Sequence, residues 1–106
     1  SQLEKKLDRR VASIQERMAE LVEKGMSSGR PVYQKTGYLY IYHTDPTAKD
    51  GRRREYVGKN KLRVEKALAK VARQNEYDKL AAKMEELERL RQSIEIPIAR
   101  ALNQLA

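Results

Sequence analysis

The 106-residue chain contains no cysteine, tryptophan or phenylalanine, and its one histidine is His43. Without cysteine no disulfide can form, which fits a reducing compartment without proving one. Without phenylalanine and tryptophan, the core must consist of aliphatic side chains and some tyrosine. The length predicts one small domain, residues 1–106, with a modest core that association with a second copy would enlarge.

Long apolar runs are also absent. No stretch approaches the roughly 20 apolar residues that span a bilayer. The N-terminal residues form a charged amphipathic pattern that differs from a signal peptide. We therefore expect no membrane partner and a cytoplasmic location.

Residues typical of catalysis and cofactor binding are scarce. The chain has no Walker loop, no dinucleotide-binding fingerprint, no paired-carboxylate signature and no serine at an interpretable spacing from a base. His43, Asp45 and Asp50 resemble metal ligands in type, but they fall in or beside a predicted loop, where polar residues are common. The sequence predicts a non-enzymatic protein with no cofactor and no metal.

Positive charge, in contrast, is abundant and concentrated in the middle of the chain. Residues 30–73 contain 12 Lys/Arg and 4 Asp/Glu, which accounts for the whole formal charge of +8. The flanks nearly cancel, with 6 basic and 5 acidic residues in 1–29 and 5 basic and 6 acidic residues in 74–106. The middle segment also holds five of the six tyrosines. Positive charge interleaved with aromatic rings suits nucleic acid, because cations contact phosphates and rings stack on bases.

The N-terminal residues show helical periodicity. Apolar side chains recur every three or four positions, at Leu3, Leu7, Val11, Ile14, Met18 and Leu21. This spacing predicts a helix within residues 1–25. Gly25 is a typical helix stop, and the polar segment 27–31 that follows predicts a loop.

A β-hairpin is predicted for residues 37–58. Residues 38–42 alternate with period two between tyrosine and aliphatic side chains, which indicates a strand. Turn-forming residues fill 44–51, and residues 52–57 can return as a second strand. The connection is too long to fix the pairing register.

Two further helices are predicted. Gly58 ends the hairpin, and Asn60 is a candidate N-cap for a basic helix over residues 60–74, with apolar Val64, Leu68 and Val71. Asn75 is expected to break the helix, and a C-terminal helix follows over residues 76–105. Pro97 either kinks that helix or starts a short tail helix.

These elements predict an α+β fold that is mostly helical, with antiparallel, coiled-coil-like helical arms flanking one basic β-hairpin. A hairpin of this kind is unstable alone, so its apolar side is expected to lean on the helix that carries Val64 and Val71. The apolar stripes left on the arms predict a homo-oligomer.

The hairpin carries the candidate binding residues. Tyr38, Tyr40 and Tyr42 share one strand face, and the aliphatic face between them is the expected inner one. Aligning Val57 with the inner face places Arg52, Arg54 and Tyr56 beside the tyrosines. For any single tyrosine the alternative remains that its ring covers the helix and only its hydroxyl reaches water.

Further basic residues extend this positive surface. Lys59, Arg63, Lys66 and Lys70 are three or four positions apart and are therefore expected on one helical face. The full set predicted to bind nucleic acid is Arg52, Arg53, Arg54, Lys59, Lys61, Arg63, Lys66, Lys70, Tyr40, Tyr42 and Tyr56.

The predicted function is that of a nucleic-acid-binding accessory or regulatory protein of a bacterial, phage or plasmid system. No base-reading motif is present, so we expect non-specific or shape-driven binding, with DNA and RNA both open. The alternative is a coiled-coil protein-interaction module, such as an adaptor, chaperone-like subunit or inhibitor, that grips an acidic protein partner.

Residues 30–90 carry a resemblance to a known family. The aromatic strand at 37–42, the basic return strand at 51–57 ending in Tyr56 and Val57, and the basic helix leading to residues 80–90 resemble a family of small bacterial proteins of unknown function. That family has cysteines before the hairpin, which this chain lacks, and it implies no catalytic or binding residue. The order helix, hairpin, helix is also similar in layout to prefoldin-type chaperone subunits and to coiled-coil DNA-end proteins of phages, which implies no function.

Overall fold

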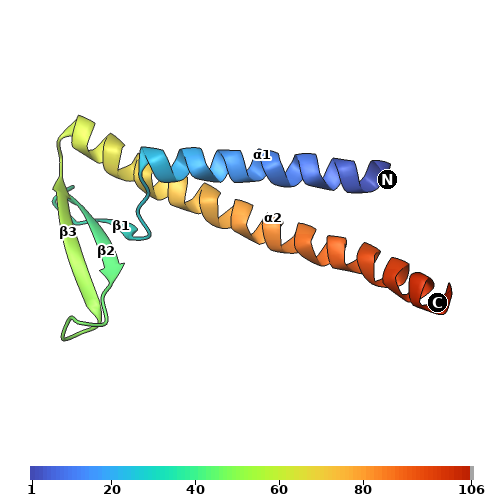
Figure 1. The fold of residues 1–106 in the computed structure, drawn as a ribbon. Helices are drawn as coiled ribbons and strands as arrows, with labels where there is room; N and C mark the ends of the chain where they lie inside the picture. The colour runs from blue at the N-terminus through green and yellow to red at the C-terminus, as the bar shows by residue number, and fades with distance from the viewer. Residues whose placement is uncertain (106) are drawn as a thin grey trace. The chain divides into compact units, whose positions relative to one another are not determined.

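The computed structural model describes residues 1–105, except for the side chains of 96–99 and 105 (Figure 1). In chain order its elements are α1 (Gln2–Lys24), β1 (Arg30–Tyr33), β2 (Leu39–Thr44), β3 (Arg52–Gly58) and α2 (Lys61–Leu105). The fold is α+β and mostly helical, with two long helices and a three-stranded antiparallel sheet among the described residues. This confirms the predicted fold class.

The chain groups into two compact units, which divide both helices. The helical unit consists of Ser1–Glu20 and the residues from Asp78 onward, and the sheet unit consists of Leu21–Tyr77. Each unit has its own apolar cluster. Whether the two behave as the single domain expected from the length stays a prediction.

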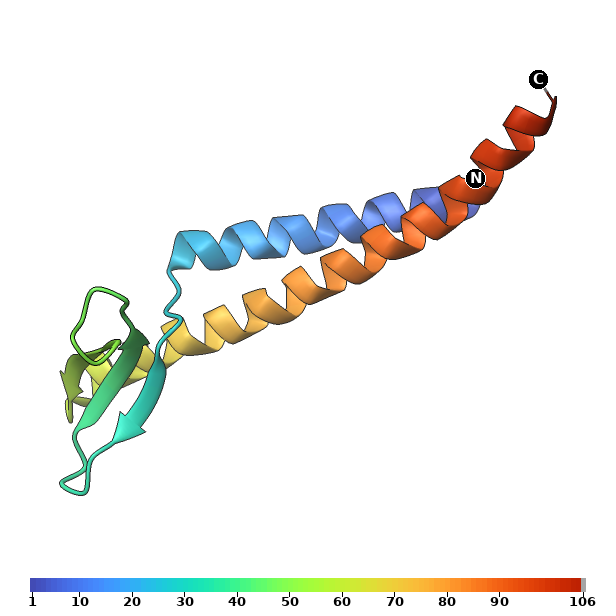
Figure 2. The same cartoon turned by 90° about the horizontal axis from the view of Figure 1, so that it is seen from below.

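The core of the helical unit follows the apolar stripe predicted for the first helix. Leu7 and Ile14 of α1 and Leu87 of α2 are buried, and partly buried neighbours pack around them: Val11, Met18, Leu80, Met84 and Ile94. An ion pair joins Asp8 of α1 to Arg91 of α2. Asp8 lies early in α1 and Arg91 late in α2, and Figure 2 shows the two helices running antiparallel, as predicted.

The predicted end of the first helix is confirmed at Gly25. Its φ of +96° is a left-handed backbone conformation that glycine adopts without a steric cost. Its N–H donates to the carbonyl groups of Leu21 and Val22, both at 3.1 Å. Arg73 of α2 also contacts this helix end, because its Nε donates to the Gly25 carbonyl over 2.7 Å.

The sheet has one strand more than the predicted hairpin. The strand order is β1-β2-β3, so β1 is an edge strand and covers positions 30 and 31, which were expected to lie in a loop. Pro31 pairs with Ile41 of β2. Proline has no N–H to donate, which an edge strand tolerates because only one of its sides is paired.

The inner face of the sheet packs on the first turns of α2, as predicted. Leu39 and Ile41 of β2 and Val57 of β3 are buried there. The helix contributes partly buried side chains at helical spacing, namely Val64, Ala67, Leu68 and Val71. This contact stabilises strands that would not persist alone in water.

The helix break predicted at Asn75 is wrong. α2 is a single helix from Lys61 to Leu105, so the predicted helices 60–74 and 76–105 are one. Asparagine is less favourable than alanine in a helix by under about 0.7 kcal/mol. The packing of α2 residues before and after Asn75 outweighs this small cost. The N-cap prediction is confirmed, because the Asn60 side-chain oxygen accepts a hydrogen bond from the Arg63 N–H at 3.1 Å.

α2 also continues through position 97, so no separate tail helix begins at Pro97. The kink expected near that residue stays a prediction, since its side chain lies outside the described part of the structure. Over the described residues, neither helix combines the length and the apolar character needed to cross a membrane.

Candidate nucleic-acid interface

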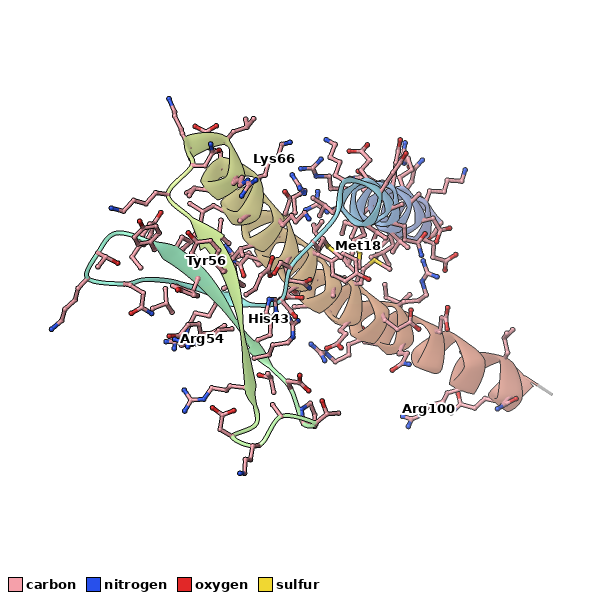
Figure 3. The ribbon with its side chains drawn as sticks, turned by 90° about the vertical axis from the view of Figure 1, so that its left-hand side faces the viewer. Met18, His43, Arg54, Tyr56, Lys66 and Arg100 are labelled. Atoms are coloured by element: carbon pink, nitrogen blue, oxygen red, sulfur yellow. The ribbon has the colours of Figure 1, made fainter. Side chains whose placement is uncertain are left out.

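The outer face of the sheet is defined by the burial of the opposite face. Ile41 is 1% exposed and Leu39 is fully buried against α2, so the alternating tyrosines of β2 point away from that helix. This decides against the alternative in which the tyrosine rings cover the helix. Figure 3 shows the same division, with Arg54 projecting to the side of the sheet away from α2 and His43 to the side of α2.

Strand pairing places the return strand in the predicted register. Tyr40 pairs with Tyr56, and Tyr42 pairs with Arg54. Directly paired residues have side chains on the same face, about 4.5–5.5 Å apart at Cβ. A register shift lies between Leu39 and Tyr40, next to these pairs. The outer face therefore brings together aromatic and guanidinium groups from two strands.

Three tyrosine rings form a cluster on this face. The ring centroids of Tyr40 and Tyr56 are 5.4 Å apart in an edge-to-face arrangement, and those of Tyr38 and Tyr56 are 6.2 Å apart. Both distances lie in the favourable range for aromatic pairs. Tyr56 is 59% exposed and Tyr38 is 38% exposed, so the cluster presents ring surface to solvent.

Cations border the aromatic cluster. The Arg54 guanidinium carbon lies 5.4 Å from the centre of the Tyr40 ring, and Lys59 Nζ lies 4.6 Å from the centre of the Tyr38 ring. Such cation–π contacts orient the cations along the rings. Arg52 follows on the same face, since it pairs with Thr44 at the end of β2.

β1 adds residues that the sequence analysis missed. Arg30 pairs with Tyr42, which places a further guanidinium on the outer face. Gln34, just after β1, donates from Nε2 to the Tyr42 hydroxyl over 3.2 Å. Only a short sequence pattern indicates this strand. Val32 and Tyr33 precede a turn that ends at Gly37, where φ is +86°. Pro31 and the polar residues before it obscured that signal.

Within the described part of the structure, the outer-face cations have few nearby carboxylates. Among the described residues, no carboxylate forms an ion pair with Arg52, Arg54 or Lys59. The sheet unit as a whole contains 13 Lys/Arg and 6 Asp/Glu. An excess of unpaired cations around exposed rings attracts a polyanion.

Lys59 differs from its predicted position, whereas Arg53 lies on the face opposite the tyrosines, as the alternation along residues 52–57 predicted. Arg53 alternates with its neighbours and points to the inner face, where its Nε lies 4.0 Å from Asp45 Oδ2. Lys59 precedes α2 and contacts Tyr38, so it does not share a helical face with Arg63, Lys66 and Lys70. The rule of three- or four-residue spacing applies only inside a helix, and α2 begins at Lys61.

The remaining predicted residues lie on α2. Lys61 is its exposed first residue, and Arg63, Lys66 and Lys70 follow at helical spacing. These last three side chains line a pocket on the inner side of the sheet, so the structure separates them from the outer face. The single positive surface predicted from sequence is therefore two surfaces.

No metal site is formed around His43. His43 Nε2 lies 2.8 Å from Glu55 Oε1, whereas the Asp45 carboxylate accepts hydrogen bonds from Thr47. Across the described residues, no three histidine, cysteine or carboxylate side chains converge as metal ligands do.

Comparison with known proteins identifies no relative. The chain matches no protein-family model, no curated protein and no solved structure. Function must therefore be argued from the residues and their geometry.

Proposed function

We propose that this chain is a non-enzymatic nucleic-acid-binding protein that uses the outer face of its sheet. The observation that carries the proposal is the cluster of Tyr38, Tyr40 and Tyr56, bordered by Arg54 and Lys59 at cation–π distances. A sheet face with exposed rings and unpaired cations supplies the two interactions that single strands use, base stacking and phosphate contact.

The geometry favours single-stranded over double-stranded ligands. Bases stack on a ring only when they are unstacked from their neighbours, as in single strands, loops and ends. Tyr56 is the most exposed ring of the cluster and therefore the first candidate for stacking. Every base has a flat face, so stacking of this kind tolerates sequence, in agreement with the lack of a base-reading motif.

The proposed biological role is that of an accessory or regulatory protein. It would act in the cytoplasm of a bacterium, as a protein of the bacterium itself or of a phage or plasmid that it carries. Self-association through the helices is part of the proposal. Leu3 of α1 and Leu90 of α2 are 51% and 45% exposed in the helical unit, and a second copy would cover such side chains. Sedimentation of the protein alone measures this directly.

The proposal is tested by fluorescence anisotropy of labelled single-stranded DNA, duplex DNA and RNA over a salt series. The variant Arg52→Gln/Arg54→Gln removes two outer-face cations, and the control Arg9→Gln/Arg10→Gln removes two exposed cations of α1. For a single strand the slope of log K against log salt is negative, and each lost phosphate contact reduces its magnitude by about 0.7. We expect the magnitude to be smaller by about 1.4 in the first variant and unchanged in the control.

Absence of binding at low salt contradicts the proposal and turns attention to the alternative, an acidic protein partner. Equal loss in both variants also contradicts it, because the binding would then follow net charge and not the outer face.

A further inference from the structure

A pocket of about 500 Å³ lies in the sheet unit on the inner side of the sheet. Three of its walls carry polar side chains: α2 supplies Arg63, Lys66 and Lys70, the segment after α1 supplies Ser27 and Ser28, and the sheet supplies His43 and Glu55. Its volume is within the range of small-molecule sites, about 300–1,000 Å³. Among the residues of the outer-face proposal, Tyr56 also borders this pocket, whereas Arg52, Arg54 and Lys59 do not line it.

The α2 wall is built to meet an anion. Arg63, Lys66 and Lys70 fall three and four positions apart inside a helix, so their side chains lie along one face. Within the described part of the chain, none of them is ion-paired with a carboxylate. Cations that converge on a cavity without partners favour a ligand with a compact, multiply charged group such as phosphate.

The serine wall is held in place by backbone contacts. The Ser27 N–H donates to the Lys70 carbonyl over 3.1 Å, which ties the segment to α2. The Ser27 hydroxyl oxygen accepts from the Gly29 N–H at 3.4 Å, so its own proton is still available for donation. A Cβ at Gly29 would lie 2.2 Å from Ile41 Cγ2, which shows how closely the segment approaches the sheet.

The sheet wall has a different chemistry. His43 Nε2 and Glu55 Oε1 lie 2.8 Å apart, and the His43 side chain is 15% exposed. The Glu55 carboxylate repels an anion but accepts hydrogen bonds from a hydroxyl or amino group. Ile41, Val57 and Ala67 add apolar surface beside this pair. A ligand for the whole pocket therefore combines a phosphate with a partly apolar group that carries hydrogen-bond donors.

We propose that this pocket binds the phosphomonoester of a nucleoside. Arg63, Lys66 and Lys70 hold the phosphate, the serine hydroxyls donate to it, and the nucleoside lies against the apolar surface with Glu55 accepting from its hydroxyl or amino groups. Such a group occurs both as a free mononucleotide and as the phosphorylated end of a strand. The proposal does not depend on binding at the outer face.

The test is isothermal titration of the full chain with adenosine monophosphate, with adenosine and with inorganic phosphate. The variant Lys66→Gln/Lys70→Gln changes exposed side chains, and Arg52→Gln/Arg54→Gln is the matched control with two cations removed from the outer face. Each lost charge-assisted hydrogen bond weakens binding by about tenfold or more. We expect adenosine monophosphate to bind better than either fragment, with binding lost in the pocket variant and kept in the control.

Three results overturn the proposal: no binding of adenosine monophosphate, adenosine binding as well as its monophosphate, or equal binding by the pocket variant and the unaltered chain. Circular dichroism confirms that each variant keeps its helices. Loss of oligonucleotide binding in the outer-face variant, with adenosine monophosphate still bound, shows that the two surfaces act separately.

A second arm identifies the source of the phosphate. Oligonucleotides with a 5′-phosphate and with a 5′-hydroxyl are compared for binding to the chain and to the pocket variant. Tighter binding of the phosphorylated strand, abolished in the pocket variant, assigns the pocket to strand ends. Equal binding of the two strands, together with binding of adenosine monophosphate, assigns it to the free nucleotide.

Discussion

The helical unit and the sheet unit differ in how far their charged residues balance. The helical unit has 10 Lys/Arg and 9 Asp/Glu, and pairs such as Asp8–Arg91 and Lys83–Glu86 join them. The sheet unit has 13 Lys/Arg and 6 Asp/Glu, and its outer-face cations have no carboxylate partner in the described structure. Balanced charge suits a solvated helix pair, whereas the unbalanced charge of the sheet unit is consistent with the proposed polyanion ligand.

Aromatic and glycine content separates the units in the same way. All six tyrosines and all five glycines lie in residues 21–77. The rings supply stacking surface, and four of the glycines adopt the positive φ values that helix ends and tight turns require. Because the helical unit has no aromatic residue, tyrosine fluorescence reports on the sheet unit alone. The difference in composition therefore provides its own spectroscopic probe.

The largest expected effect comes from the two cores. Ile41→Ala in the sheet unit and Ile14→Ala in the helical unit each truncate a side chain that is at most 5% exposed. Each is expected to cost about 2–5 kcal/mol of unfolding free energy, measured by thermal denaturation. Only Ile41→Ala is expected to abolish oligonucleotide binding, since it loosens the sheet that positions the tyrosines. Equal loss of affinity in both variants would remove the functional distinction between the units.

The next effect separates the two faces of the sheet. Tyr56 on the outer face and Tyr33, which pairs with Leu39 of the inner face, are 59% and 58% exposed. Tyr56→Leu is expected to weaken binding of a single-stranded oligonucleotide by about 1–3 kcal/mol, the contribution of one stacked base. Tyr33→Leu removes an equally exposed ring and should leave affinity unchanged. A larger loss with Tyr33→Leu places the binding surface elsewhere.

The two units should also differ in whether gain or loss of one methyl group destabilises them. Gly29→Ala in the sheet unit adds a Cβ that would lie 2.2 Å from Ile41 Cγ2 and 2.8 Å from His43 Cε1. Such overpacking is expected to cost about 1–3 kcal/mol. Ala12→Gly in the helical unit removes a methyl group from an exposed position of α1 and is expected to cost about 0.5–1 kcal/mol. Urea denaturation measures the free energy of unfolding of both variants. An unchanged value for Gly29→Ala would show that the neighbouring side chains of Ile41 and His43 move aside without cost.

The smallest effect concerns the turn between β2 and β3. The Thr47 hydroxyl and N–H donate to the Asp45 carboxylate, and the Arg53 guanidinium adds to them, so the pKa of Asp45 lies below its ordinary value. A folded pKa below the unfolded one means that the ionised group stabilises the turn above the unfolded pKa. This stabilisation is lost as the pH falls through the folded pKa. Thr47→Val should raise the pKa of Asp45 in an NMR titration, whereas Thr36→Val in the preceding turn should not.

The sequence predicted the elements whose signal is local. The apolar stripe from Leu7 to Met18, the alternation from Tyr38 to Tyr42 and the Asn60 cap each depend on neighbours within one element, and all three are confirmed. The assignment of inner and outer strand faces is also confirmed, because burial of Leu39 and Ile41 determines where the tyrosines point.

The missed features depend on residues far apart in the chain. β1 is defined by pairing with β2, although Pro31 is typical of a loop. Asn75 remains helical because packing along α2 outweighs a weak intrinsic preference. Lys59 precedes the Asn60 cap and contacts Tyr38, whereas Lys66 lines the inner pocket because of the way α2 packs on the sheet. The spacing of basic residues within one segment does not show which side of a helix faces a sheet.

The most direct test of the outer-face interface is photocrosslinking of the full chain to single-stranded DNA that contains 5-bromodeoxyuridine. Mass spectrometry of the crosslinked peptides then locates the contact. We predict crosslinks in β2, which carries Tyr40, in β3, which carries Tyr56, and in the turn before β2, which carries Tyr38. Crosslinks confined to residues 1–20 and 78–105 would contradict the assignment of nucleic-acid binding to the sheet unit.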